Sequence, residues 1–144
     1  MGRYRPILAS FTLVLVLAGC SSNDTAHGDA VAGRALYDQH CATCHGRNLE
    51  GQPDWRTRLP TGRMPAPPHD DSGHTWHHAD EILFGITKYG VSPRYAPPGY
   101  QSDMPAFAAS LSDPQIRDVL AYIKSRWSPR AREAQAQIDK KARQ

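Results

Sequence analysis

The sequence predicts an all-α fold, with three main helices joined by long loops rich in glycine and proline. No run of alternating apolar and polar residues is long enough to indicate a β-strand. Apolar residues instead recur at helical spacing, most clearly in the segment after Leu111. The 144 residues include 11 glycines and 12 prolines, and loops built from them bury little apolar surface. We therefore expect a cofactor to complete the core.

The length and charge of the chain indicate one domain without a nucleic-acid partner. A domain of about 100 residues fits between the two ends of the chain, and a second one does not. The formal net charge is +3, but residues 20–127 carry 10 basic and 12 acidic side chains. They contain no basic stripe with interleaved aromatic residues, as nucleic-acid binding would require. We expect the folded domain to occupy residues 29–127.

Residues 1–19 have the pattern of an export signal. Arg3 and Arg5 precede an apolar run over residues 7–18, which is about 12 residues long and too short to span a bilayer. A run of this length suits the hydrophobic part of a signal peptide. It ends in Leu17-Ala18-Gly19-Cys20, which resembles the lipobox of bacterial lipoproteins.

Cys20 is the predicted lipid attachment site. In a lipoprotein the signal is cleaved before this cysteine, which then receives acyl chains. Several chains give a lasting anchor, because one chain alone holds only marginally. Residues 20–28 would be the polar tether, and the exported domain would face the periplasm or the outer side of the plasma membrane. Ordinary export with cleavage at a small residue is the alternative.

Cys41, Cys44 and His45 form a C-x-x-C-H motif. Two thiols at this spacing can add across the vinyl groups of one haem, and the adjacent histidine can ligate its iron. A thioredoxin-like redox pair belongs near a βαβ pattern, which this chain lacks. A structural zinc site needs two further ligands at matching spacing, and no second C-x-x-C exists. The motif predicts one covalently bound haem c.

From about Gly28 to Trp127 the chain resembles the class I monohaem cytochromes c. Besides the haem motif, the resemblance rests on residues 33–37 before it and on residues 102–107 near the last helix. It implies three main helices around one haem and an electron carrier, not an enzyme. The partners of such a carrier would be membrane or periplasmic redox proteins. The first helix, with Gly33 and Tyr37, should cross the last helix near Leu120 and Tyr122.

The resemblance also implies a proline carbonyl that accepts a hydrogen bond from the second ring nitrogen of His45. Such a bond fixes the tautomer of the ring and makes it a stronger iron ligand. Pro53 is the first candidate for this role and Pro60 the second. Both follow the motif in its Gly/Pro-rich loop region.

Met104 is the predicted sixth ligand of the iron. It stands in Ser102-Asp103-Met104-Pro105-Ala106-Phe107, which resembles the family's methionine loop. Met64 has a similar local sequence but lies only about 20 residues after His45, and Met1 leaves with the signal. A thioether ligand raises the reduction potential, and two filled axial positions favour a carrier over a catalyst. A haem enzyme with a displaceable sixth ligand is an alternative function.

The segment His69–His78 packs four of the seven histidines beside two carboxylates. One hypothesis is a second metal site, for example copper, in a copper-handling protein. The other is a structured loop in which Trp76 and one histidine bind the haem propionates or cap the middle helix. Trp55 is a further candidate for a propionate contact.

Two helices are predicted from the residues themselves. The middle one runs from about Ala79 to Tyr89, with acidic residues in its first turn and Gly90 at its end. The last one begins after Ser112, whose hydroxyl group and Gln115 form a capping box, with Pro114 in its first turn. Its apolar stripe consists of Ile116, Val119, Leu120, Ile123 and Trp127. Residues 128–144 are polar all round and are predicted to be a flexible, charged tail.

Overall fold

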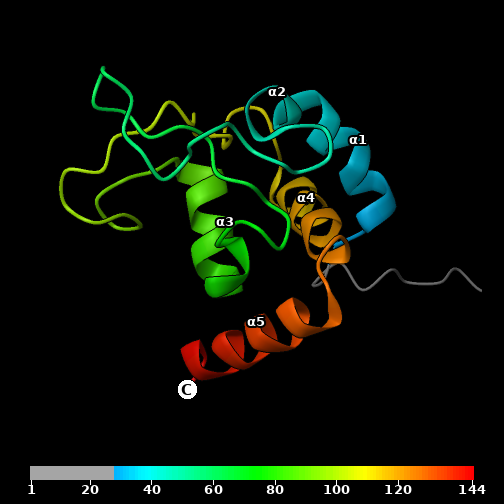
Figure 1. The fold of residues 1–144 in the computed structure, drawn as a ribbon. Coiled ribbons are helices and arrows are strands. Elements are labelled where there is room, and N and C mark those ends of the chain that lie inside the picture. The colour runs from blue at the N-terminus through cyan, green and yellow to red at the C-terminus, as the bar shows by residue number, and fades with distance from the viewer. Residues whose placement is uncertain (1–27) are drawn as a thin grey trace, which may run out of the picture.

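The computed structural model describes residues 28–144, which form helices joined by loops (Figure 1). The predicted export signal and Cys20 lie outside the described residues. Within them, the β-type pairing is limited to one isolated bridge between Met64 and Ser102, so the all-α fold class is confirmed. None of the described helices is long and apolar enough to cross a membrane. The elements are α1 (Ala30–His40), α2 (Ala42–His45), the 3₁₀ turn η1 (Thr75–His77), α3 (Asp80–Tyr89), α4 (Asp113–Ser125) and α5 (Pro129–Ala142).

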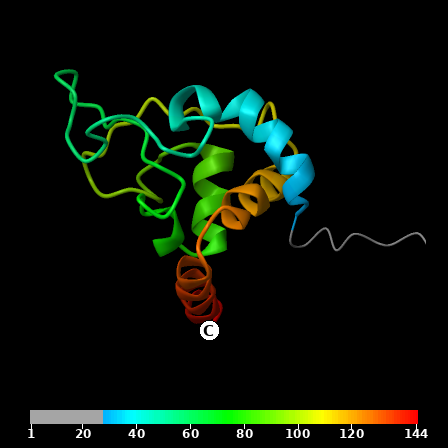
Figure 2. The same ribbon diagram turned by 45° about the vertical axis from the view of Figure 1, so that its right-hand side comes forward.

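Helices α1 and α4 cross in close contact, on the side of the molecule away from the long loops (Figure 2). Gly33 permits this approach, because a β-carbon at this position would collide with the backbone of Asp118. Beside the crossing, the rings of Tyr37 and Tyr122 pack with centroids 5.3 Å apart. The expected contact between the first and last helices is therefore confirmed at the two tyrosines. Gly33 itself lies against Asp118 and not against Leu120.

Helix α4 has the predicted cap and the predicted buried face. Ser112 Oγ accepts a hydrogen bond from the Gln115 N–H at 3.4 Å, and Gln115 Oε1 accepts one from the Ser112 N–H at 2.9 Å. These reciprocal bonds are the capping box, and Pro114 lies in the first turn. The apolar stripe is buried along its length, at Ile116, Val119, Leu120, Ile123 and Trp127.

Helix α3 agrees with the predicted middle helix but is capped by a distant residue. It begins at Asp80, ends at Tyr89 and is followed by Gly90 with φ +75°. The preceding residue, Ala79, has no side chain that could cap the helix. Asp139 of α5 supplies the cap instead, because its Oδ1 accepts a hydrogen bond from the Asp80 N–H at 2.9 Å.

The prediction of a flexible tail over residues 128–144 is wrong. These residues form α5, which lies on the side of the molecule opposite α1 and α2 (Figure 1) and packs against η1. Ser128 caps its N-terminus. Sequence reasoning missed this helix because its buried face is partly polar: Gln135 donates to the carboxylate of Asp80 at 2.6 Å, and Asp139 caps α3. The buried residues of α5 are Ala131, Gln135 and Asp139.

Replacing Asp139 with alanine should destabilise the folded protein. The change removes the cap of α3 and should lower the free energy of unfolding by about 1–2 kcal/mol. Urea unfolding of the holoprotein, followed by circular dichroism, measures this. Lys141→Ala is the matched control, because this side chain is exposed on the same helix and its loss should change the free energy by less than about 0.5 kcal/mol. Equal effects of the two substitutions would contradict the capping role.

Candidate functional site

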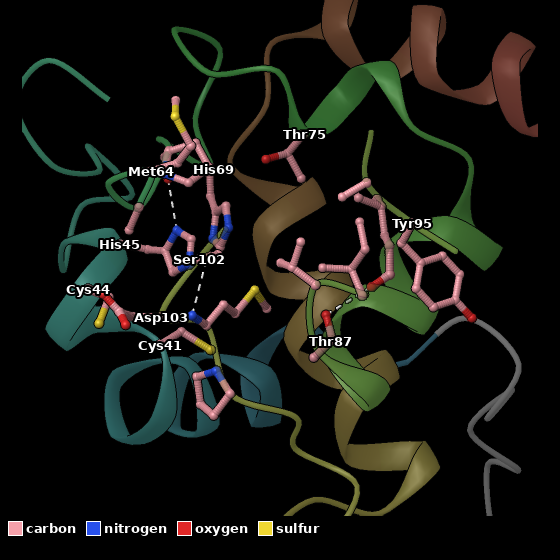
Figure 3. A pocket seen from close by; sticks show the side chains of 18 of the residues that line it. Cys41, Cys44, His45, Met64, His69, Thr75, Thr87, Tyr95, Ser102 and Asp103 are labelled. Carbon is pink, nitrogen blue, oxygen red and sulfur yellow. Dashed lines mark hydrogen bonds between the residues drawn. The ribbon is translucent and has the colours of Figure 1, made fainter. Parts of the chain in front are cut away.

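A cavity of about 400 Å³ lies between the corner of α1 and α2, the helices α3 and α4, and the two long loops (Figure 3). Helices α3 and α4 contribute apolar walls, with Leu83, Ile86, Val119, Leu120 and Ile123. Side chains able to form thioether bonds or to ligate a metal reach the same cavity. They are Cys41, Cys44, His45, Met64, His69, His74, His78 and Met104.

The C-x-x-C-H motif forms a single helical turn at this corner. The carbonyl oxygen of Cys41 accepts hydrogen bonds from the N–H groups of Cys44 at 3.1 Å and His45 at 2.9 Å, so all three side chains reach the cavity wall. Both thiols are free. Burial raises the pKa of Cys41 to about 12, and the charge of Cys44 adds to the rise. Redox-active cysteine pairs need a thiol with a lowered pKa, so the raised pKa of Cys41 argues against a thioredoxin-like role.

His45 is buried and held by the backbone. Its Nδ1 lies 2.8 Å from the carbonyl oxygen of Pro67 and acts as the donor in that hydrogen bond. Burial lowers the pKa of His45, although the bond to Pro67 opposes this shift. The ring is therefore neutral near pH 7, and its Nε2 carries the lone pair that a metal needs.

The proline that holds His45 is neither of the two that the sequence analysis named. Pro53 and Pro60 were wrong, because the chain after the motif forms a loop that brings the carbonyl of Pro67 to His45 Nδ1. Gln52 and Ala66 close this loop: the Gln52 N–H donates to the Ala66 carbonyl at 2.9 Å, and the Ala66 N–H donates to Gln52 Oε1 at 2.8 Å. The run Pro65-Ala66-Pro67-Pro68 was the available signal in the sequence.

Met64 and Met104 both line the cavity, and their loops are joined. The Met64 N–H donates to the carbonyl of Gln101 at 2.8 Å, next to the bridge between Met64 and Ser102. The Met104 N–H donates to Ser102 Oγ at 3.1 Å, and the Met104 side chain packs against the apolar core. The structure thus brings both candidate iron ligands to one site. The preference for Met104 stays a prediction.

Trp55 and Trp76, the predicted propionate contacts, do not line the cavity. Trp76 Nε1 donates to the carbonyl of Asp71 at 3.3 Å. Trp55 stacks on His74 with ring centroids 5.2 Å apart, and the Arg56 guanidinium lies over the Trp55 ring, 4.0 Å from its centroid. The contacts of these tryptophans with the haem propionates stay a prediction, because neither tryptophan lines the cavity.

The histidine-rich segment contributes imidazoles to the cavity but no cluster of metal ligands. His69, His74 and His78 line the wall, whereas His77 stacks on Trp76 with centroids 3.7 Å apart. Between residues 28 and 144, no group of three or more His, Cys, Asp or Glu side chains is arranged to hold a metal ion. The copper hypothesis therefore lacks a ligand set in this part of the chain.

His69 contacts the haem motif directly, which sequence reasoning missed. Its ring stacks on that of His45, with centroids 3.8 Å apart and planes inclined by 18° (Figure 3). Its Nδ1 is buried without a hydrogen-bond partner. Burial places the pKa of His69 well below the usual value, and the charges that His45 and His74 would carry lower it further. No motif in the sequence signals this stack.

Comparison with known proteins identifies the class that this fold and site define. The family model described as "Cytochrome c" matches residues 30–127, which is more than half of the chain. The chain belongs to the cytochrome c family. Members of this family are electron carriers with a covalently bound haem c, and they work with redox proteins outside the cytoplasm. The predicted family, fold class and cofactor are thereby confirmed.

The individual relatives are cytochromes from three bacteria. Cytochrome c-551 of Bacillus subtilis is 36% identical over 55 residues, which are 31% of this chain and 49% of the relative. Cytochrome c-554(547) of Halothiobacillus neapolitanus is 60% identical over 25 residues, 17% of this chain and 28% of the relative. Cytochrome c-555 of Prosthecochloris aestuarii is 28% identical over 108 residues, 69% of this chain and 90% of the relative. The matches thus span about half and about a quarter of the first two relatives. No solved structure matches the chain.

The residues of the cavity fit a haem c. Two thiols from one helical turn, a neutral imidazole beside them and methionine sulfur atoms meet in a space with largely apolar walls. Groups of these kinds could attach a porphyrin, ligate its iron and keep it out of water.

Proposed function

We propose that this chain carries one electron at a time on a haem bonded to Cys41 and Cys44, with His45 and Met104 as the iron ligands. The observation that carries the proposal is the orientation of His45 beside the two thiols. Its ring is neutral, buried and anchored at Nδ1 by Pro67, so Nε2 is available to a metal. The bound haem supplies a reversible Fe(II)/Fe(III) couple.

The surroundings of the cavity suit a carrier. Apolar side chains from α3 and α4 exclude water from one side, which favours the less charged, reduced state of the site. Cys44 is exposed while Cys41 is buried, so the edge of the cavity at Cys44 reaches the surface. A redox partner can approach there without entering the protein.

Met104 is preferred over Met64 as the second iron ligand. Its side chain packs against the apolar core, and Pro105 after it restricts the backbone of its loop. Further along the same loop, the Phe107 N–H donates to the carbonyl of Thr87 at 3.1 Å, which ties the loop to α3. A rigid loop holds a thioether at fixed distance from iron, and a thioether ligand places the carrier at the oxidising end of an electron-transfer chain.

A spectrum and a ligand-binding measurement test this function together. The purified protein should keep its haem through acid-acetone extraction, which removes haem that is not covalently bound, and should cycle between two oxidation states. The reduced protein should not bind carbon monoxide rapidly, because both axial positions are filled by the chain. Rapid binding by the unmodified protein would favour a haem enzyme with a displaceable ligand.

We further propose that a lipid on Cys20 tethers the domain to the membrane. The lipobox-like sequence before Cys20 and the polar residues 20–28 support this proposal. The carrier would then exchange electrons with membrane or periplasmic redox proteins.

Replacing Cys20 with alanine, behind an export signal whose cleavage does not need a lipidated cysteine, should release the mature domain from the membrane. The wild-type protein should sediment with membranes and partition into detergent, whereas the variant should remain in the aqueous fraction. The haem spectrum should be the same in both, because Cys20 is not part of the haem motif. A variant that stays with the membranes would contradict the lipid anchor.

A further inference from the structure

The stack of His69 on His45 is a feature of the site that electron transfer alone does not require. The two rings lie face to face, with centroids 3.8 Å apart and planes 18° apart (Figure 3). Nδ1 of His69 is buried and has no hydrogen-bond partner. A leucine could fill this space without leaving a polar atom unpaired, so packing alone does not account for the imidazole.

His69 is itself fixed from several sides. Its N–H donates to the carbonyl of Leu49 at 2.8 Å, and its carbonyl accepts from Trp127 Nε1 at 2.8 Å. The ring of Tyr37 meets the His69 ring edge-on, with centroids 5.8 Å apart and planes at 66°. Since both the backbone and the ring are held, His69 presents a rigid flat surface to His45.

Pro67 restrains the position of His45, whereas His69 restrains the plane of its ring. The hydrogen bond from Nδ1 fixes the position of that atom, but a carbonyl oxygen accepts hydrogen bonds over a broad range of angles. Face-to-face contact with the His69 ring allows a smaller range of orientations, because any tilt of the His45 plane brings atoms of the two rings together. The two restraints together define both the position and the plane of the imidazole.

We propose that His69 is a positioning residue that sets the plane of the iron-ligating imidazole of His45. The inference rests on the proposed function, in which His45 ligates the haem iron. The plane of this imidazole determines which iron d orbitals it overlaps, and that overlap governs how unpaired spin spreads over the porphyrin in the ferric protein. His69 thus acts on the iron only through His45.

Proton NMR of the ferric holoprotein tests the proposal, because the shifts of the haem methyl groups report the orientation of the axial ligands. His69→Leu removes the flat surface, and we expect the order of the methyl resonances to change. His69→Phe keeps a flat ring at the same place, and we expect the wild-type order to be retained. Leu111→Val is the control, since Leu111 is buried in the core but is not one of the residues that line the cavity, and we expect the wild-type order in this variant.

A merely structural role for His69 would alter the unfolding midpoint and leave the order of the methyl resonances unchanged in both variants. That result would overturn the proposal, and so would an equal change in His69→Leu and His69→Phe. If the leucine variant does not mature, the phenylalanine variant decides alone: wild-type order supports the proposal, and an altered order contradicts it. Failure of the proposed function would look different, because the wild-type protein would then hold no covalent haem.

Discussion

Replacing both Cys41 and Cys44 with alanine is expected to abolish haem attachment and, with it, the folded state. The thiols are the two covalent links that the motif provides, so the double variant should be colourless after acid-acetone extraction and should have the mass of its amino acids plus any lipid. The cavity left behind measures about 400 Å³. Without the haem, the apolar side chains of α3 and α4 that line this space would face water, which removes much of the hydrophobic stabilisation of a small domain.

Mass spectrometry and circular dichroism check the two parts of this prediction separately. The single variants Cys41→Ala and Cys44→Ala should each retain one thioether link and a reduced yield of holoprotein. Cys20→Ala is the matched control, because it also removes one cysteine but leaves the haem motif intact. Covalent haem in the double variant would disprove attachment at these two residues.

Replacing Met104 with alanine should lower the reduction potential and open the iron to added ligands. Axial ligands set haem potentials over a range of about 0.8 V, and loss of the thioether should lower the potential by on the order of 0.1–0.3 V. The reduced variant should bind carbon monoxide rapidly. The ferric variant should lose the absorption that arises from charge transfer between sulfur and iron.

The matched control is Met64→Ala, because Met64 lines the same cavity and its loop is joined to the Met104 loop at Ser102. This variant should keep the wild-type potential within the error of a redox titration and should bind carbon monoxide as slowly as the wild type. If the effects of the two substitutions are reversed, Met64 is the ligand and the assignment of Met104 fails.

The features that were predicted best are those that depend on residues close to one another in the sequence. The capping box of Ser112 and Gln115 spans one helical turn, and the stripe from Ile116 to Trp127 follows from helical spacing, so both are local. The C-x-x-C-H turn is local as well. These features sufficed to predict the all-α class and the attachment site of the haem.

The features that the sequence did not predict depend on the path of loops and on contacts between distant residues. Pro67 reaches His45 only because the intervening loop closes between Gln52 and Ala66, and nothing near Pro53 or Pro60 indicates that closure. Helix α5 has no continuous apolar stripe, since its buried residues Gln135 and Asp139 both form hydrogen bonds with Asp80, which lies 55 and 59 positions earlier in the chain. Only the folded chain shows these partners.

The cap that Asp139 places on α3 makes one wall of the haem site depend on the last helix of the chain. Cys41 and Cys44 lie about 100 residues before Asp139 in the sequence, so they are synthesised before it. Until then α3, whose residues line the cavity, lacks its N-terminal hydrogen-bond partner. We expect the thiols to be accessible to the ligation machinery before α3 has its final cap, and this wall of the pocket to become rigid once α5 has packed.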